Sequence, residues 1–529
     1  MLLSIVRRSR RRRDRRGGKQ AGWLAGAVGA ALGLAALGLA AATVPAHAQV
    51  AAGVPAASRL GPQVVHTGAG PTGYSVTFRV YDPSATRMRI KGEWSFASAA
   101  EITADPTNST PSYGYDWQPG EFPLASPNAG PAANWPVTDM TEDQATGVWS
   151  YTTPLPSGVF TYALYPGCDA AAPALTGCTA MADPANPPWS TTGSPELTSQ
   201  VYVPSDPRFG TVNYWWQGPA PQGDQGTLTH LTYSSPGHAG PTNENYLVAY
   251  TPPGYNPHRR VPYPVFYLVH GGGGNEMDWS TQGDMKNIMD NLIAAHEIQP
   301  MVIVMPNNPT DAEMTDDILP YVQRNFDVAA EPSGRSFAGL SGGASVVQDF
   351  LYGDTTEFGY YGVWSAPTGL PTATQAASPE LKQLLGLHIG DGLQDLGGRA
   401  HANIAAEEAL LTSTDVPFVE FNVNGGHNWA YWRLALRDFL TKVGFRATSV
   451  SVAAHGRTVS ASVTPATGEP ATPTGTIRFE LNGGPLGGPV RLHGGKATLV
   501  LPPDAAGGTV IATYGGDSLY NPGSGKSSI

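Results

Sequence analysis

The chain has 529 residues, a formal net charge of −11 and a hydrophobic share of 41%, so it is long enough for about three domains with real cores. Its 64 glycines and 48 prolines indicate turn-rich, largely β-structured portions. An acidic chain of this kind does not suit nucleic acid or other anionic polymers as partners.

The first 48 residues have the pattern of a secretory signal peptide. Arg7–Lys19 carries eight Arg, one Lys and one Asp, Ala21–Thr43 is uncharged and apolar, and Ala46–Ala48 is an A-x-A cleavage site. The apolar run is also long enough for an uncleaved membrane anchor, and the arginines would suit a nucleic-acid or lipid-binding patch. Residues 1–48 hold nine of the 31 basic and one of the 42 acidic residues, so the remainder carries a net charge of −19. We expect a secreted protein with no membrane partner after cleavage.

Residues 60–205 predict short strands separated by turns. Tyr74–Asp82 and Arg87–Trp94 alternate in the period-2 manner of half-buried strands, and Gly147–Gly167 predicts a hairpin. The stretches "VTFRVYDPSATRMRIKGEW", "GVWSYTTPLPSGVFTYAL" and "DPANPPW" resemble early-set immunoglobulin-like modules grouped with carbohydrate-binding module family 48. This resemblance implies a β-sandwich, which in some relatives binds sugar.

The tryptophans and cysteines of this region could each have either of two roles. Trp94, Trp117 and Trp149 could form a sugar-binding platform, but packing in the core is the favoured interpretation. Cys168 and Cys178 are the only cysteines, and their short separation in an exported chain predicts a disulfide over two free thiols. Two cysteines without a nearby histidine cluster do not indicate a metal site.

A Gly/Pro/Gln-rich linker over residues 206–227 precedes a domain at 228–445 with a different pattern of predicted secondary structure. Apolar, non-alternating strands here alternate with helical patterns, which predicts a mostly parallel sheet covered on both faces. The expected strands are Pro264–Val269, Met301–Met305, Tyr361–Ser365, Leu387–Ile389 and Phe418–Val423, and the expected helices are Met285–Ala295, Thr315–Phe326, His401–Thr412 and Trp429–Val443.

The β texture returns over residues 448–529. The stretches "TGTIRFELNGGPL", "GGKATLVLPP" and "GTVIATYGGDSLYNPGSG" resemble bacterial immunoglobulin-like repeats, with the distinctive ending Y-x-G-D-x-x-Y-x-P. This resemblance implies a second β-sandwich that acts as a spacer or adhesion module.

The pentapeptide "GLSGG" (Gly339–Gly343) carries the G-x-S-x-G pattern that places a serine nucleophile on a strand-to-helix turn. Ser341 then needs a base, and in α/β-hydrolases this histidine follows the last strand of the sheet. His427 lies in such a loop, "NGGHNW", directly before the last helix. His388 falls inside a strand and His401 opens a helix, so structural roles are simpler for both.

A nucleophile of this kind also needs an acid that orients the histidine and backbone donors for the oxyanion. Asp395, a few residues past the strand that ends in "LHIG", is preferred as the acid over Asp391. Gly342 follows the nucleophile and supplies one N–H. Gly272, in "HGGGG" (His270–Gly274), is the choice for the second donor, with Gly271 and Gly273 as alternatives.

The central domain resembles the esterase D-type family, which includes the feruloyl and acetylxylan esterases of carbohydrate esterase family 1 and their mycolyltransferase relatives. The motifs are "YTPPGYNPHRRVPYPVFYLVHGGGGNEMDW", "AGLSGGAS" and "GGHNWAYWRLALRDFL". The resemblance implies an α/β-hydrolase fold, a triad of Ser341, Asp395 and His427, and no metal or cofactor. The family elbow usually reads G-x-S-M-G-G. Here Gly342 replaces the methionine and Ala344 the last glycine, which leaves substrate preference open.

Three tryptophans fall near the expected active edge of the sheet. Trp279, Trp364 and Trp429 could stack on an aromatic acyl group or a sugar, or they could simply pack in the core. Asp278 is expected to help hold the loop next to Trp279.

Together these features predict an α/β-hydrolase domain flanked by two β-sandwich domains. The expected activity is that of a secreted serine esterase acting on acyl esters of polysaccharides, of the feruloyl or acetyl type. One alternative is an acyltransferase of the mycolyltransferase type. Others are a non-catalytic secreted carbohydrate-binding or adhesion protein and, ranked last, a secreted serine peptidase.

Overall fold

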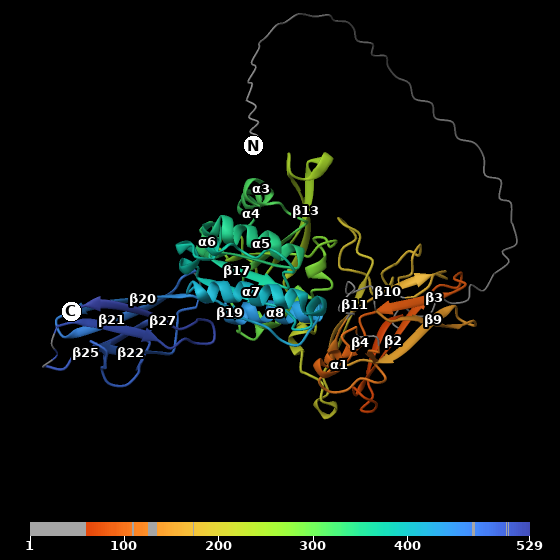
Figure 1. Ribbon diagram of the computed structural model, residues 1–529, viewed down its shortest axis with the longest axis horizontal. Coiled ribbons are helices and arrows are strands. Elements are labelled where there is room, and N and C mark those ends of the chain that lie inside the picture. The colour runs from red at the N-terminus through yellow and green to blue at the C-terminus, as the bar shows by residue number, and fades with distance from the viewer. Residues whose placement is uncertain are drawn as a thin grey trace, which may run out of the picture. The chain divides into compact units, whose positions relative to one another are not determined.

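A computed structural model describes residues 60–529 apart from 108–109, 125–134, 173, 468–470, 504 and 506. The signal peptide predicted over residues 1–48 lies outside the described residues. The predicted fold class is confirmed, because an α/β domain stands between two β-sandwich modules in the chain (Figure 1).

The N-terminal module is a sandwich whose described residues form two four-stranded sheets of order β1-β2-β9-β8 and β11-β10-β3-β7. Apolar side chains at alternate positions of the strands form one shared core, as the period-2 pattern predicts. The strand predicted as half-buried within Arg87–Trp94 differs, because Arg89 and Lys91 between its apolar positions are buried as well. The strands are β1 (Gly61–His66), β2 (Tyr74–Tyr81), β3 (Met88–Gly92), β7 (Val137–Asp139), β8 (Thr141–Asp143), β9 (Val148–Pro154), β10 (Gly158–Pro166) and β11 (Ser199–Val203). A small sheet contains β4 (Ser95–Ala97), β5 (Ser112–Tyr113) and β6 (Phe122–Pro123). Helix α1 (Ala99–Ala104) follows β4 in the chain.

The hairpin predicted over Gly147–Gly167 is wrong. Strand β9 pairs with β2 and β8, whereas β10 pairs with β3 and β11, so consecutive strands belong to different sheets. Pro154 ends β9 and Pro156 lies in the connection, and proline has no N–H to donate to a strand ladder. The chain therefore crosses from one sheet of the sandwich to the other at this point.

The predictions for the tryptophans and cysteines of this module are confirmed. Trp94, Trp117 and Trp149 are buried in the core of the sandwich, which excludes a sugar platform made of these three side chains. Cys168 and Cys178 form a disulfide.

The central domain is built on a sheet in which the described strands follow the order β12-β13-β15-β14-β16-β17-β18-β19. Strands β12 and β13 run antiparallel, and every pair from β15 and β14 onward is parallel. The carboxyl ends of β14, β16, β18 and β19 therefore meet at one edge of the sheet. The strands are β12 (Thr227–Ser234), β13 (Glu244–Thr251), β14 (Val265–Val269), β15 (Val302–Pro306), β16 (Arg335–Leu340), β17 (Tyr360–Trp364), β18 (Gly386–Gly390) and β19 (Val419–Glu420).

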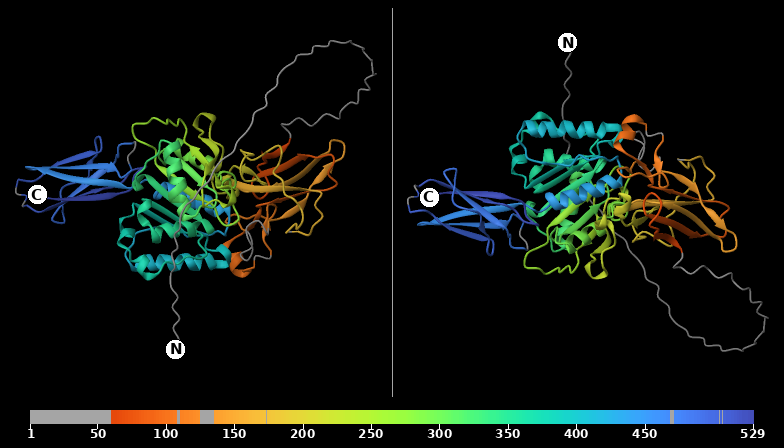
Figure 2. Two further views of the ribbon diagram at one scale, coloured as in Figure 1. Left: turned by 90° about the horizontal axis from the view of Figure 1, so that it is seen from above. Right: turned by 90° about the horizontal axis from the view of Figure 1, so that it is seen from below.

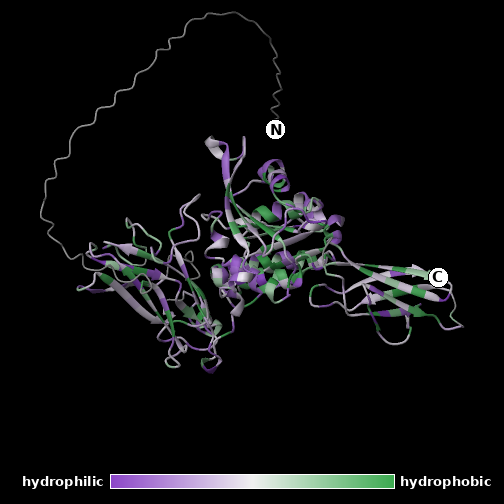
Figure 3. Cartoon of the chain, turned by 180° about the vertical axis from the view of Figure 1, so that it is seen from behind, coloured by the Kyte–Doolittle hydropathy of each residue, from purple (hydrophilic) through white to green (hydrophobic). Residues whose placement is uncertain are grey.

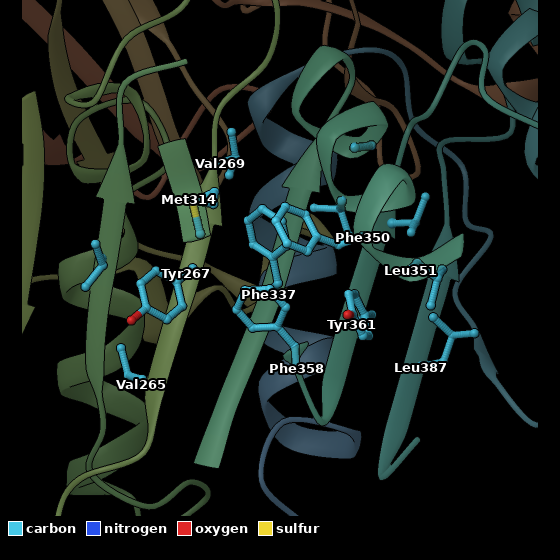
Figure 4. Close-up of a cluster of buried hydrophobic side chains, with 14 of the residues drawn as sticks. Val265, Tyr267, Val269, Met314, Phe337, Phe350, Leu351, Phe358, Tyr361 and Leu387 are labelled. Carbon is cyan, nitrogen blue, oxygen red and sulfur yellow. The ribbon is translucent and has the colours of Figure 1, made fainter. Parts of the chain in front are cut away.

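Helices cover both faces of this sheet. Val265, Tyr267 and Val269 pack in one cluster with residues of the helices α4 to α7, whereas Phe266 and Leu268 pack on the opposite face with α2 and α8 (Figure 4). In Figure 1, α5 and α6 lie above the sheet and α8 below it, and α8 crosses the strands in the view from below (Figure 2). The helices are α2 (Met285–Ala294), α3 (Asp311–Glu313), α4 (Leu319–Asn325), α5 (Gly342–Gly353), α6 (Ala373–Ala376), α7 (Arg399–Ser413) and α8 (Trp429–Lys442).

Two predicted elements of this domain differ from the structure. The helix predicted at Thr315–Phe326 starts earlier, at Asp311, and contains a π-helical segment, Met314–Ile318, before α4 begins at Leu319. The strand predicted at Phe418–Val423 is shorter, because the side-chain carbonyl of Asn422 accepts the N–H of Asp391 where a regular ladder would use a backbone carbonyl. The chain nevertheless follows β18, since the N–H of Phe421 donates to the carbonyl of Ile389.

The C-terminal module is a second sandwich. In the part of it that the structure describes, the sheets have the orders β20-β21-β25 and β23-β22-β26-β27, with β24 paired to β22. Hydrophobic and polar residues alternate along its strands (Figure 3), so one face of each sheet lines the core. The strands are β20 (Thr448–His455), β21 (Thr458–Pro465), β22 (Thr476–Leu481), β23 (Gly484–Pro485), β24 (Val490–Arg491), β25 (Lys496–Val500), β26 (Thr509–Tyr514) and β27 (Gly523–Ser528).

Candidate active site

Ser341 lies on a sharp turn between strand β16 and helix α5. Its backbone angles are φ 52° and ψ −118°, a conformation that costs free energy for any residue with a side chain. The end of strand β16 and the start of helix α5 approach each other closely. A Cβ on Gly339 would lie only 2.6 Å from the carbonyl carbon of Gly343. The glycines on either side of Ser341 thus allow the turn that lifts its hydroxyl from the sheet edge.

His427 reaches Ser341 from the loop between β19 and α8. Its Nε2 lies 2.9 Å from the Ser341 hydroxyl oxygen, and its Nδ1 lies 2.7 Å from Oδ1 of Asp395. Since Nδ1 faces a carboxylate, it carries the proton, and Nε2 is free to accept from the serine hydroxyl. The structure brings the three residues that sequence reasoning selected into one hydrogen-bonded chain.

The loop that carries Asp395 is tied to the loop that carries His427. The side-chain carbonyl of Gln394 accepts the N–H of Gly425 at 2.9 Å, and the N–H of Gln394 donates to the carbonyl of Gly425 at 3.0 Å. The Asp395 side chain is completely buried. Two hydrogen bonds between Gln394 and Gly425 therefore hold the loop of Asp395 against the loop of His427.

Asp391, the alternative acid, has a different partner. Its Oδ1 lies 3.0 Å from Nδ1 of His401, and the carboxyl group is buried. Burial raises the pKa of Asp391 to about 7, and the nearby charges of Asp395 and Glu408 act in the same direction. The geometry favours Asp395 as the partner of His427 and leaves Asp391 beside it as a second, separate pair.

Two backbone N–H groups lie beside the serine. A Cβ on Gly342 would come within 3.0 Å of the Gly272 nitrogen, so the "HGGGG" loop and the first turn of α5 are in close contact. Gly342 opens a helix, where N–H groups have no intrahelical partner. Gly272 is exposed, and its N–H donates to no backbone carbonyl of the described residues. Both predicted donors are therefore available to a ligand.

His270 forms hydrogen bonds to the glycine loop and to the backbone of Asn308. Its Nε2 accepts the N–H of Asn308 at 3.1 Å, so the proton resides on Nδ1, which donates to the carbonyl of Gly271 at 2.7 Å. Burial lowers the pKa of His270, which keeps the imidazole neutral in this role.

A cleft of about 340 Å³ opens above these groups. Its lining combines the glycine loop, the nucleophile and histidine, aromatic side chains and polar or acidic side chains. The lining residues are Pro195, Glu196, Leu197, Thr198, Gly271, Gly272, Gly273, Gly274, Asn275, Asp278, Gln282, Leu340, Ser341, His427, Trp429 and Trp432.

The N-terminal module supplies one wall of this cleft through Pro195–Thr198. Ser194 fixes that segment, because its N–H and hydroxyl donate to the two carboxylate oxygens of buried Glu276 at 2.9 Å and 2.8 Å. Glu196 accepts the Thr281 hydroxyl at 3.1 Å and the N–H of Thr198 at 2.8 Å. Segments about 80 residues apart are thus joined beside the nucleophile.

The structure corrects two of the three tryptophans predicted as substrate-binding. Trp364 is completely buried in strand β17, where its Nε1 donates to Nδ1 of His388 at 2.9 Å. Trp279 is 1% exposed, and its Nε1 donates to the carbonyl of Val269. Both indoles belong to the buried cluster that packs with α2 and α8, so neither can stack on a substrate. Trp429 does line the cleft and keeps its predicted position.

Sequence reasoning missed other cleft residues. Trp432 packs edge-on against His427 with ring centroids 5.0 Å apart, and its Nε1 donates to the Ser365 hydroxyl. The helical spacing from Trp429 could have indicated this position, since residues i and i+3 share a face. No sequence signal indicates that Glu196 and Leu197, in another module, reach the same cleft.

Two other kinds of site are absent from the described residues. No group of three or more His, Cys, Asp or Glu residues there could hold a metal ion. No helix in the described portion is long and apolar enough to cross a membrane.

Comparisons with known proteins agree with this architecture. Residues 241–443 match the family described as "Putative esterase", and residues 446–529 match the family described as "Bacterial Ig-like domain (group 3)".

Two curated proteins are similar to part of the chain. An endo-1,4-beta-xylanase/feruloyl esterase of Xylanibacter ruminicola is 36% identical over 125 residues, which cover 21% of this chain and 17% of that protein. Endo-1,4-beta-xylanase Y of Acetivibrio thermocellus is 32% identical over 144 residues, 24% of this chain and 12% of that protein. The chain thus spans less than a fifth of the length of either protein. A solved ferulic acid esterase from Anaeromyces mucronatus is 18% identical with a TM-score of 0.39, covering 44% of this chain and 96% of the other.

Proposed function

We propose that the central domain hydrolyses carboxylic esters through an acyl-enzyme formed on Ser341. The observation that carries this proposal is the continuous hydrogen-bonded chain Asp395–His427–Ser341, which ends at a cleft beside two free backbone N–H groups. A nucleophile, a base, an orienting acid and oxyanion donors are the four parts that acyl transfer requires.

These four parts act in a fixed order during the reaction. Ser341 Oγ attacks the ester carbonyl while His427 Nε2 takes its proton, and Asp395 stabilises the resulting imidazolium. The N–H groups of Gly342 and Gly272 hold the oxyanion of the tetrahedral intermediate. The intermediate collapses with loss of the alcohol, which takes its proton from His427. Water, activated by His427, then attacks the acyl group and releases the acid.

The substrates that we propose are acyl esters of polysaccharides, of the feruloyl or acetyl type. One of the two similar proteins is named for both xylan cleavage and feruloyl esterase activity, and the other for xylan cleavage alone. The aromatic side chains Trp429 and Trp432 in the cleft would suit an aromatic acyl group.

We further propose that the enzyme acts outside the cell. The sequence pattern of residues 1–48 supports export, and the disulfide between Cys168 and Cys178 is of a kind that persists in oxidising compartments.

The experiment that tests the activity is a stopped-flow assay of the full chain with p-nitrophenyl acetate, followed by a panel of methyl ferulate and acetylated xylan. We expect a burst of p-nitrophenol equal to the concentration of active sites. Ser341→Ala is expected to lose the burst and to lower kcat at least about 10⁴-fold. Turnover by Ser341→Ala close to that of the unmodified chain would contradict the proposal.

A further inference from the structure

Asp278 is a buried carboxyl group at the edge of the candidate active site. It begins the short helical turn η7 (Asp278–Ser280), four residues after the glycine loop, and lines the cleft together with Ser341 and His427. The residue is only 8% exposed. A Cβ on Gly274 would lie 2.1 Å from its Oδ2, so the carboxyl group packs directly against the glycine loop.

The carboxyl group of Asp278 lacks a side-chain partner. Within the described residues no side chain donates a hydrogen bond to it, and the backbone of Asn275 is what favours its charged form. Burial raises the pKa of Asp278 to about 7, and the charges of Glu196 and Glu276 act in the same direction.

The neighbouring carboxylates of Glu276 and Glu196, in contrast, accept hydrogen bonds from side chains. Glu276 accepts hydrogen bonds from Ser194 and His230. Glu196 accepts from Thr198 and Thr281, which fixes it in the wall of the cleft. Among the described residues the Asp278 carboxyl accepts from the backbone of Asn275 alone, so it keeps acceptor capacity that a ligand hydroxyl can use.

We propose that Asp278 is a specificity-determining residue that binds a hydroxyl group of the substrate next to the scissile ester. This inference rests on the proposed function, because the cleft is the one served by Ser341. A hydroxyl group suits this position, since it can donate to an ionised carboxylate and accept from a protonated one.

The charge of the cleft narrows the class of substrate further. Its lining carries the two acids Glu196 and Asp278 and no Lys or Arg. Anionic substituents would be repelled there, whereas uncharged hydroxyl groups would not. The hydroxyl could belong to a phenolic acyl group or to a sugar on the alcohol side of the ester.

Matched ester pairs separate these two sources. Methyl ferulate and methyl 3,4-dimethoxycinnamate differ by a free hydroxyl on the acyl side, and 2-hydroxyethyl ferulate and ethyl ferulate differ by one on the alcohol side. The readout is the ratio of kcat/KM within each pair, measured for the full chain and for Asp278→Ala and Asp278→Asn. The burst with p-nitrophenyl acetate counts the working sites of each variant, and circular dichroism and thermal melting check its fold.

We expect one of the two pairs to show a preference for the hydroxylated ester of about 10- to 100-fold, which Asp278→Ala abolishes. Asp278→Asn is expected to retain part of this preference, because an amide still accepts a hydrogen bond. Asp349→Asn, which removes an exposed carboxylate from helix α5, should keep the full ratio.

Ratios that stay unchanged in both Asp278 variants would overturn the inference while leaving the proposed function intact. Absence of a burst in the unmodified chain would instead overturn the proposed function itself. A preference that is absent in both pairs of the unmodified chain would also contradict the role of Asp278.

Discussion

Nε2 of His427 lies 2.9 Å from the hydroxyl oxygen of Ser341, although the two residues are 86 positions apart in the chain. The parallel sheet brings them together, because Ser341 follows β16 and His427 follows β19 at the same edge. Asp395 completes the arrangement from the end of β18, and each of the three groups depends on its neighbour for its protonation state and orientation.

The identity of the acid can be tested by comparing Asp395→Asn with Asp391→Asn. We expect Asp395→Asn to lower kcat about 10³- to 10⁴-fold, because an amide no longer stabilises the imidazolium and can hold the wrong tautomer. Asp391→Asn should lower kcat less than about tenfold, since Asp391 bonds to His401. Steady-state kinetics with p-nitrophenyl acetate distinguishes the two, and equal losses would show that the acid is not assigned correctly.

Asp391 should instead affect the pH dependence of the reaction. Its pKa is raised to about 7, so above this pH its ionised carboxylate adds a second negative charge near Asp395. Below this pH Asp391 is protonated and uncharged, so Asp391→Asn should leave the acid part of the kcat/KM profile unchanged. Across a midpoint near pH 7 the unmodified chain gains the negative charge and the variant does not, so the ratio of their kcat/KM values should change there. Asp349→Asn provides the control, and a ratio that stays constant from about pH 5 to about pH 9 would contradict the raised pKa of Asp391.

Gly342 departs from the elbow pattern G-x-S-M-G-G of the family that this sequence resembles, and the structure gives a reason for the glycine. A Cβ at this position would lie 3.0 Å from the Gly272 nitrogen, closer than ordinary contact. Gly342→Ala should displace the loop that carries one oxyanion donor and lower kcat about tenfold. Gly353→Ala, near the other end of α5, meets no atom within 4 Å and serves as the control. An unchanged kcat in Gly342→Ala would show that the glycine loop can move without loss of the oxyanion donor, which would contradict this prediction.

The wall of the cleft formed by Pro195–Thr198 should depend on its anchor at Ser194. Ser194→Ala removes one hydrogen bond to Glu276, which should lower the free energy of unfolding by about 1 kcal/mol. It should also raise KM for methyl ferulate about two- to fivefold, because substrate binding must then order the segment. Ser190→Ala is the matched control, since the Ser190 hydroxyl bonds to the exposed Thr192. Equal KM values for the two variants would exclude a role for the wall.

Sequence reasoning predicted which residues lie together in the candidate site where this depends on local pattern and on the order of elements along the chain. Ser341 was identified by the glycines that its turn requires, and His427 and Asp395 by their places after successive strands. These signals survive in a single sequence, because strand ends in a parallel sheet fall at one edge.

It failed where the answer depends on packing across the fold. Trp364 occupies a strand, and whether such a side chain faces solvent or core depends on the helices that cover it. The wall at Glu196 depends on contacts with residues about 80 positions away. The hairpin predicted between β9 and β10 failed for the same reason, since pairing partners are chosen by the whole sandwich.

The most direct test of the central claim is to locate the acyl group. The full chain is mixed with p-nitrophenyl acetate, quenched in acid during the burst and digested, and the peptides are analysed by mass spectrometry. We predict a single acetyl group on Ser341, absent in Ser341→Ala and strongly reduced in His427→Ala. An acetyl group on another residue, or turnover without any acylated peptide, would contradict the account.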